Sequence, residues 1–285
     1  MDYIHIEQRN ITINKNDILS ILQFQKEDII YLSGSLIEGS RNKLSKGMGN
    51  KLSDIDVFIL ADDFDKIEKS LLDYDRDQIK TQFKKLHGIS IDIEIYSKVV
   101  IYDLLEQINN VTFSDDTRIF NVINLPNGLD LYYFTSLIHR FINGVPIYND
   151  DKFDEVRRNF KEENFYKFMT RVSVNKIDVN YEDVVGNIDS GNLEVAVSIA
   201  RSILMETMKA YIFYNKTSID RDKWIPLKIK NLAFYDSDAL KVYEKFKKLY
   251  FEEKLDNDKS LRINAEKIID FSNEIVSKIG QAGEF

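Results

Sequence analysis

Two aspartates that flank a single apolar residue, Asp54 and Asp56, have the side-chain type and the spacing needed to bind a divalent cation. They open an apolar run. In an extended strand alternate side chains emerge on the same face, so these two lie about 6.6 Å apart along the backbone. Mg2+ prefers oxygen ligands and accepts one or two carboxylates together with substrate phosphates. The pair therefore predicts a metal site that acts on a phosphorylated substrate.

A Gly-Ser pair, Gly34 and Ser35, precedes these aspartates and follows the short apolar run at 29–32. Because glycine has no side chain, the backbone N–H groups of such a turn can approach a phosphate closely. A phosphate-binding turn ahead of a metal-binding pair predicts nucleotide chemistry. Taken alone, an Asp-x-Asp is usually a solvated strand end and a Gly-Ser pair is usually a plain turn.

A third carboxylate is expected on a later strand. Residues 88–96, GISIDIEIY, alternate isoleucine with polar residues, which is typical of a strand with one buried face. The polar face carries Asp92 and Glu94. Close carboxylates repel each other and raise one another's pKa unless a cation neutralises them, so a fold that gathers three of them needs a cation.

This order of strand, Gly-Ser, loop, Asp-x-Asp, strand and later acidic strand resembles the nucleotidyltransferase superfamily, the DNA polymerase β-like enzymes. The resemblance covers roughly the first half of the chain. It implies that Asp54, Asp56 and Asp92 are catalytic and hold two Mg2+ ions. Asp92 fits the family pattern better than Glu94, which stays an alternative ligand or base.

The same resemblance implies the reaction. Gly34 and Ser35 would hold the β- and γ-phosphates of an NTP, the donor substrate. Asp54 and Asp56 would bind the Mg2+ that bridges these phosphates, and Asp56 with Asp92 would hold the ion that activates an acceptor hydroxyl. A nucleoside monophosphate would pass to the acceptor, with release of pyrophosphate.

The positioning elements predict an α+β fold. Strands are expected at 29–32, 57–60 and 88–96, and helices at 18–24, 64–72, 79–86, 99–108 and 131–142. Gly and Pro at 143–150 mark a break. We therefore predict a catalytic α/β domain with a mixed sheet at 1–145 and a helical bundle at 146–285, with helices at 153–174, 193–214, 239–251 and 263–279.

This layout is similar to that of the two-domain antibiotic-type nucleotidyltransferases. The likeness implies that Lys223 contacts the triphosphate across an interdomain cleft; the alternative is a solvated lysine beside Trp224. Three charged residues of the 193–214 helix, Glu194, Arg201 and Glu206, either line the cleft or face water. Residues 36–53, which are long and cationic for this motif, form either a basic flap over the triphosphate or a mobile insertion.

Composition sets broader bounds. The net charge of −8 and the pI of about 5.1 argue against a nucleic-acid-binding surface as the main feature, although a local basic groove would be compatible with them. The chain has no cysteine, which excludes disulfides and thiolate metal sites. Its three histidines do not favour a histidine-rich metal site. The N-terminus does not resemble a signal peptide, and no segment is apolar over a membrane-spanning length, so we expect a cytoplasmic protein without membrane partners.

The acceptor remains open at this level. The two-domain layout favours a small hydroxylated molecule. A signalling-nucleotide synthase or a protein AMP-transferase would use the same carboxylates, with a nucleotide or a protein side chain as acceptor. An antitoxin-like or regulatory module would keep the fold and bind nucleotide without turnover. The resembled family contains monomers and dimers, so a homodimer is compatible with the sequence.

Overall fold

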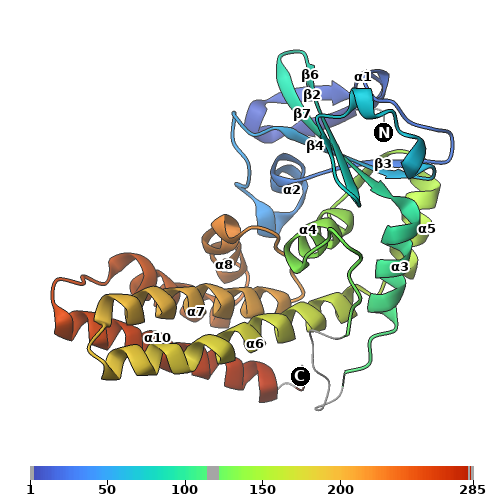
Figure 1. Ribbon diagram of the computed structural model, residues 1–285. Helices are drawn as coiled ribbons and strands as arrows, with labels where there is room; N and C mark the ends of the chain where they lie inside the picture. Colours follow the sequence, from blue (N-terminus) through green and yellow to red (C-terminus); the bar gives the residue numbers. More distant parts are fainter. Residues whose placement is uncertain (1–2, 114–121, 282, 284–285) are drawn as a thin grey trace. The chain divides into compact units, whose positions relative to one another are not determined.

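The computed structural model describes residues 3–113, 122–281 and 283, and the chain divides into two compact units (Figure 1). The first unit extends to Val111 and resumes from Ile123 to Glu162; the second contains the chain from Glu163 onward. The first unit holds a mixed six-stranded sheet with helices, and the second is helical. The predicted fold class, α+β with a mixed sheet followed by a helical part, is confirmed.

The sheet of the first unit has the strand order β5-β6-β7-β4-β3-β8. The strands are β3 (Ile29–Ser33), β4 (Ile55–Ala61), β5 (Tyr74–Asp75), β6 (Ile79–Leu86), β7 (Ile89–Ser97) and β8 (Val145–Tyr148). The two central strands, β4 and β7, run parallel, and every other pair is antiparallel. A separate hairpin pairs β1 (Tyr3–Ile6) with β2 (Ile11–Asn14).

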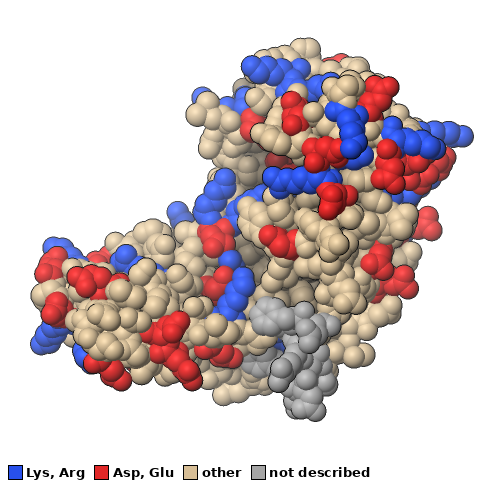
Figure 2. Space-filling view, viewed as in Figure 1, with Lys and Arg blue, Asp and Glu red and all other residues tan. Residues whose placement is uncertain are grey.

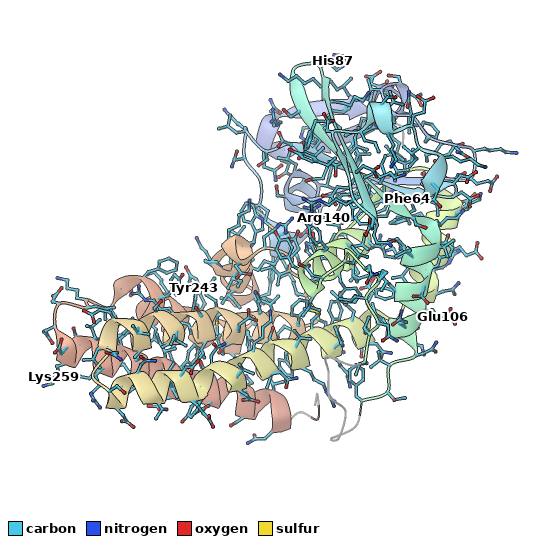
Figure 3. The ribbon with its side chains drawn as sticks, viewed as in Figure 1. Phe64, His87, Glu106, Arg140, Tyr243 and Lys259 are labelled. Atoms are coloured by element: carbon cyan, nitrogen blue, oxygen red, sulfur yellow. The ribbon has the colours of Figure 1, made fainter. Side chains whose placement is uncertain are left out.

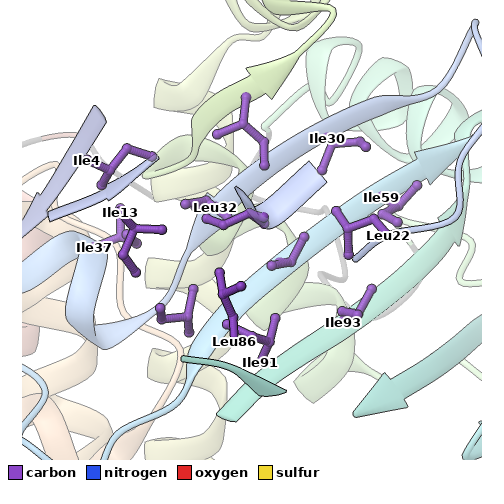
Figure 4. Close-up of a cluster of buried hydrophobic side chains, with 14 of the residues drawn as sticks. Ile4, Ile13, Leu22, Ile30, Leu32, Ile37, Ile59, Leu86, Ile91 and Ile93 are labelled. Atoms are coloured by element: carbon purple, nitrogen blue, oxygen red, sulfur yellow. The ribbon is translucent and has the colours of Figure 1, made fainter. Parts of the chain in front are cut away.

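Strands β3 and β4 are buried on both faces over most of their length, whereas one face of β7 is only partly buried. One face packs into a cluster of aliphatic side chains that includes Leu32, Ile59 and Ile93 (Figure 4). On the opposite face, Tyr31 stacks on Phe58 with 5.2 Å between ring centroids. Tyr31 also lies 5.0 Å from Phe153 of helix α5 (Asp150–Asn159). Because side chains alternate along a strand, the face that carries Phe58 also carries the residues two positions away along β4.

The helices of the first unit are α1 (Lys15–Ser20), α2 (Ser35–Arg41), α3 (Lys98–Asn109), α4 (Leu131–Ile142) and α5. Helix α4 has the predicted bounds, 131–142, and is buried over most of its length. It begins at the N-cap Asp130, whose side chain accepts a hydrogen bond from the Tyr133 N–H at 2.9 Å. This helix contributes to the site described below.

Residues 79–86 were predicted as a helix, and that prediction is wrong. They form β6, which pairs with β7 over its whole length, from Ile79 opposite Tyr96 to Leu86 opposite Ile89. A four-residue spacing such as that of Ile79 and Phe83 satisfies both a helical and a strand periodicity. Pairing with β7 selects the strand. Residues 64–72, also predicted as a helix, form two short 3-10 turns, Phe64–Lys66 and Lys69–Leu71.

The predicted helix at 153–174 is interrupted. Helix α5 ends at Asn159, and α6 (Glu162–Asp189) begins after an extended residue, Phe160. Asn109 fixes this break from outside: its side chain donates to the Asn159 carbonyl at 2.8 Å and accepts from the Lys161 N–H at 2.7 Å. The break depends on a residue about fifty positions away, which a local pattern does not reveal.

The compact units divide at Glu162, whereas the sequence suggested a boundary after residue 145. Strand β8 pairs with β3, and Phe153 of α5 packs on Tyr31, so both elements belong to the sheet. Hydrogen bonds and aromatic packing therefore hold residues 145–159 in the first unit.

The second unit is built from long helices (Figure 1). Its helices after α6 are α7 (Leu193–Tyr214), α8 (Ile225–Ala233), α9 (Ser237–Lys247) and α10 (Asp258–Gln281), with a π-helical turn at Lys248–Glu252. Helix α7 has the predicted bounds, 193–214, and packs along α10. A buried hydrogen bond of 2.9 Å between the Thr207 and Ser272 hydroxyls joins these two helices.

Within the described residues, none of the helices is both long enough and apolar enough to cross a membrane. On the face shown in Figure 2, basic and acidic side chains are interspersed over both units.

Candidate active site

Gly34 connects β3 directly to α2 and has a backbone conformation that glycine alone adopts readily, with φ of +82°. A Cβ atom at this position would overlap the Asp56 carboxylate. The turn and the aspartate are therefore in close contact. The absence of a side chain at Gly34, which is buried, leaves the space that the Asp56 carboxylate occupies.

The pairing of the central strands brings Asp56 and Asp92 together. Asp56 is opposite Ser33 in the antiparallel β3–β4 pair and opposite Asp92 in the parallel β4–β7 pair. Neighbouring strands lie about 4.8 Å apart, and paired residues point to the same face of the sheet. Asp56 and Asp92 are therefore side by side on one face, next to the end of β3 where Gly34 begins the turn.

Asp54 lies just before β4, on the same side of the chain as Asp56. Burial raises the pKa of Asp92, and the negative charges of Asp54 and Glu94 raise it further, while the Arg140 guanidinium acts in the opposite direction. Asp54 and Glu94 are thus close enough to Asp92 for their negative charges to act on it. A bound cation would relieve this repulsion.

Glu94 differs from Asp92 because both of its oxygens are already bound. Its Oε1 accepts a hydrogen bond from Arg140 Nη1 at 2.9 Å, and its Oε2 accepts one from the Tyr96 hydroxyl at 2.6 Å. Asp92 makes no such hydrogen bond or ion pair within the described residues. The geometry favours Asp92 over Glu94 as the carboxylate open to a ligand.

Arg140 of α4 is a residue of this site that the sequence analysis did not identify (Figure 3). Its Nη2 lies 4.0 Å from Asp56 Oδ1, and its guanidinium carbon is 5.1 Å from the centroid of the Phe58 ring. The side chain is only 9% exposed. An available signal was the His-Arg pair within an otherwise largely apolar helix, since buried charges are generally paired.

Arg140→Gln is expected to raise the pKa of Asp92 above its value in the unchanged protein, because Arg140 is the cation that lowers it. The same change removes the charged partner of Glu94 and should lower the free energy of unfolding by about 1–3 kcal/mol. Carboxyl-carbon NMR titration and urea unfolding measure the two effects. An unchanged Asp92 titration would show that Arg140 does not act on this carboxylate.

A second buried network holds α2 against α4. The His139 ring contacts the Glu38 carboxylate, and the Ser45 hydroxyl donates to Glu38 Oε2 at 2.7 Å. All three residues are almost fully buried. Since α2 begins at the Gly34 turn, this network fixes the element that carries the turn.

The segment 36–53, expected to be a flap or a mobile insertion between the two halves of the motif, is helical in its first part. Residues up to Arg41 belong to α2, and Lys43–Ser45 form a 3-10 turn. Met48 is buried, and its carbonyl accepts a hydrogen bond from Gln8 Nε2 at 2.8 Å. The Ser53 carbonyl accepts one from Arg9 Nη2 at 2.6 Å. These contacts tie the segment to the N-terminal hairpin and the turn that joins its strands.

Lys223 belongs to the second unit, in a 3-10 turn (Asp222–Trp224). Its Nζ lies 5.1 Å from the centroid of the Trp224 ring. This contact matches the packing expected of a lysine beside a tryptophan. Its contact with a triphosphate stays a prediction.

The described residues contain no group of three or more His, Cys, Asp or Glu side chains already arranged to hold a metal ion. The chemistry of the donors nevertheless fits Mg2+, because Asp54, Asp56 and Asp92 supply hard carboxylate oxygens. Burial is the main cause of the raised pKa of Asp92, and the negative charges of Asp54 and Glu94, which add to it, are charges that a cation would offset. Substrate phosphates would complete such a coordination shell.

Asp92→Asn is expected to raise the free energy of unfolding at pH 7 in the absence of Mg2+. The folded state binds the Asp92 proton more tightly than the unfolded chain does. The stability contribution of the protonated carboxyl is therefore complete at low pH. It is lost as pH rises from the ordinary aspartate value of about 3.9 through the higher folded-state value.

Urea unfolding of the two proteins at a series of pH values tests this prediction, with the exposed Asp151→Asn as the control. The free energy of unfolding of the Asp92→Asn variant should increase relative to that of the unchanged protein as pH rises through that interval. A stability difference that is the same at every pH would contradict the prediction.

No protein-family model matches this sequence, and no curated protein does. Among solved structures, the chain is similar to a nucleotidyltransferase-like protein from Exiguobacterium sibiricum. The two share 12% sequence identity with a TM-score of 0.48, over 93% of this chain and 74% of that one. A similarity of this degree does not establish an activity.

Proposed function

We propose that this protein is a Mg2+-dependent nucleotidyltransferase that transfers a nucleoside monophosphate from an NTP to a hydroxyl of a small-molecule acceptor. The observation that carries the proposal is the in-register pairing of Asp56 with Asp92 beside the Gly34 turn. Carboxylates gathered on one sheet face beside a turn that could contact phosphate suit metal-assisted phosphoryl chemistry.

In this proposal the backbone at Gly34 and Ser35 contacts the β- and γ-phosphates, and Asp54, Asp56 and Asp92 hold Mg2+, with Asp56 shared between two ions. When bound, the ions neutralise the charge that develops on the phosphates and lower the pKa of the acceptor hydroxyl. Lys223 is a further proposed contact of the triphosphate.

Other roles in the proposed reaction belong to side chains of the first unit. In this proposal Asp92 also takes the proton of the acceptor hydroxyl. Arg140 holds Glu94 and keeps it apart from that role. The buried His139–Glu38–Ser45 network keeps α2, and with it the Gly34 turn, in a fixed position.

The test is incubation of the full chain with each α-labelled NTP and Mg2+, with and without added acceptors, followed by measurement of labelled product and of pyrophosphate. Product that forms only with a hydroxylated small molecule supports the proposal. Product from NTP alone would instead indicate a signalling-nucleotide synthase, and label on protein would indicate a protein AMP-transferase. Absence of both product and pyrophosphate would contradict enzymatic activity.

A second candidate is a nucleotide-binding module without turnover. This candidate is favoured by Arg140, whose positive charge lies 4.0 Å from Asp56 and supplies part of the charge compensation that a metal ion would provide. Calorimetry with a non-hydrolysable NTP separates the candidates. Binding that strengthens with Mg2+ supports the enzyme, and binding that is indifferent to Mg2+ supports the silent module.

A further inference from the structure

A pocket of about 670 Å³ lies within the second unit, between α6, α7, the Asp222–Trp224 turn, the π-helical turn and α10. Small-molecule sites commonly have volumes of about 300–1,000 Å³. The charged residues of α7, Glu194, Arg201 and Glu206, all line this pocket. The sequence left open whether they line an interdomain cleft or face water; the pocket that they line lies within the second unit, and the interdomain cleft stays a prediction.

Glu206 presents one bound and one unbound oxygen. Its Oε1 accepts a hydrogen bond from Lys209 at 2.9 Å and lies 3.7 Å from Lys176 Nζ. Its Oε2 is buried and has no hydrogen-bond partner within the described residues. Lys209 also contacts Asp222 at 2.8 Å, so its charge is shared between two carboxylates. Glu206 Oε2 is therefore a buried anionic acceptor without a donor.

Arg201 carries a buried hydrogen-bond donor, the counterpart of the buried acceptor on Glu206. Its Nε is buried without a hydrogen-bond partner, and its side chain forms no ion pair within the described residues. The guanidinium carbon lies 5.8 Å from the centroid of the Tyr250 ring, which holds the side chain at the pocket wall. Arg201 Nε is a buried cationic donor without an acceptor. Five residues separate it from Glu206, or about 7.5 Å along the axis of α7.

Buried polar groups without a partner are uncommon because each loses its hydrogen bonds to water on folding. Here a donor and an acceptor of opposite charge line one pocket. Lys176 and Arg201 line the pocket together with Glu194, Glu206 and Asp222. Lys209, which is not a lining residue, pairs with both Glu206 and Asp222 and balances the charges of the cluster. A ligand with a large net charge would upset this balance, whereas a ligand with one charge of each sign would preserve it.

We propose that this pocket binds a small zwitterionic molecule, whose amine contacts the Glu206 carboxylate and whose anionic group contacts the Arg201 guanidinium. All the contacting residues belong to the second unit, so the inference does not depend on nucleotidyl transfer in the first unit.

The probes are ω-amino acids of increasing chain length, from glycine to 6-aminohexanoate, with butylamine and butyrate as single-charge controls. Binding to the full chain is measured by saturation-transfer NMR and calorimetry. One chain length should bind best, because the two charged ends must span the separation of Arg201 and Glu206. Each single-charge control should bind at least tenfold more weakly, a difference of about 1.4 kcal/mol.

Two variants assign the contacts. Arg201→Gln should weaken the best amino acid at least tenfold and leave butylamine binding unchanged, whereas Glu206→Gln should weaken the amino acid and leave butyrate unchanged. Lys241→Gln and Glu274→Gln serve as matched controls, because both side chains are largely exposed and lie outside the pocket. Thermal unfolding verifies that every variant is folded.

Two results would overturn the inference. One is binding of every ω-amino acid more weakly than ~10 mM, which would mean that water alone satisfies both groups. The other is binding that Arg201→Gln and Glu206→Gln leave unchanged, which would locate the ligand elsewhere.

Discussion

Asp56→Ala is expected to reduce nucleotidyl transfer by about 10³-fold while leaving the thermal midpoint unchanged or higher. Asp56 is the carboxylate that the β-sheet register sets between the Gly34 turn and Asp92, so its loss removes the proposed ligand shared by both ions. The same loss relieves repulsion within the acidic cluster, which accounts for the unchanged or higher midpoint.

The measurements are transfer of an α-labelled NTP, calorimetric binding of NTP with and without Mg2+, and thermal unfolding. Asp63→Ala is the control, since Asp63 is paired with Lys66 at the surface and lies outside the site. Asp54→Ala should show the same pattern as Asp56→Ala. If both aspartate variants fail to fold, the carboxylates serve the structure and the metal role is contradicted.

Gly34→Ala is expected to abolish most activity for a different reason. Alanine at a φ of +82° costs about 1–2 kcal/mol of stability, and its Cβ would also overlap the Asp56 carboxylate. Relief of that overlap requires Asp56 or the turn to move. A displacement of about 1 Å at a reacting centre can cost about 10²-fold in rate.

Gly88→Ala is a closely matched control. Gly88 has almost the same backbone angle, a φ of +80°, and a Cβ there would meet no atom within 4 Å. Both variants place alanine at a positive φ, and only Gly34→Ala brings a Cβ against Asp56. Equal losses of transfer activity in the two variants would show that backbone strain, and not contact with Asp56, explains the effect.

The elements with an unambiguous local period were predictable from the sequence. The isoleucine alternation at 88–96 corresponds to β7, and the helical spacings at 131–142 and 193–214 correspond to α4 and α7. In each case the chain's own side-chain period selects the element, because only one conformation buries the apolar residues together. Residues 79–86 fit two periods, and there the sequence alone led to the wrong element.

The contacts within the site could not be predicted from local sequence patterns. The sequence singled out Gly34, Asp56 and Asp92, but their proximity depends on which strands pair and in what register. Arg140 was missed because its partner Glu94 is 46 residues away along the chain. The sequence around either residue does not indicate that the two form a pair.

The sequence by itself determined the fold class, the order of the motif residues and the division into an α/β part and a helical part. These features follow from local periodicity and residue type, which are properties of neighbouring positions. Only the tertiary structure decided that Arg140 and Tyr96 bind Glu94, that Arg140 opposes the acidic cluster, and that Arg201 and Glu206 share a pocket. Each of these outcomes depends on burial and on charges brought together from distant segments. Their energies arise only when the strands and helices have packed.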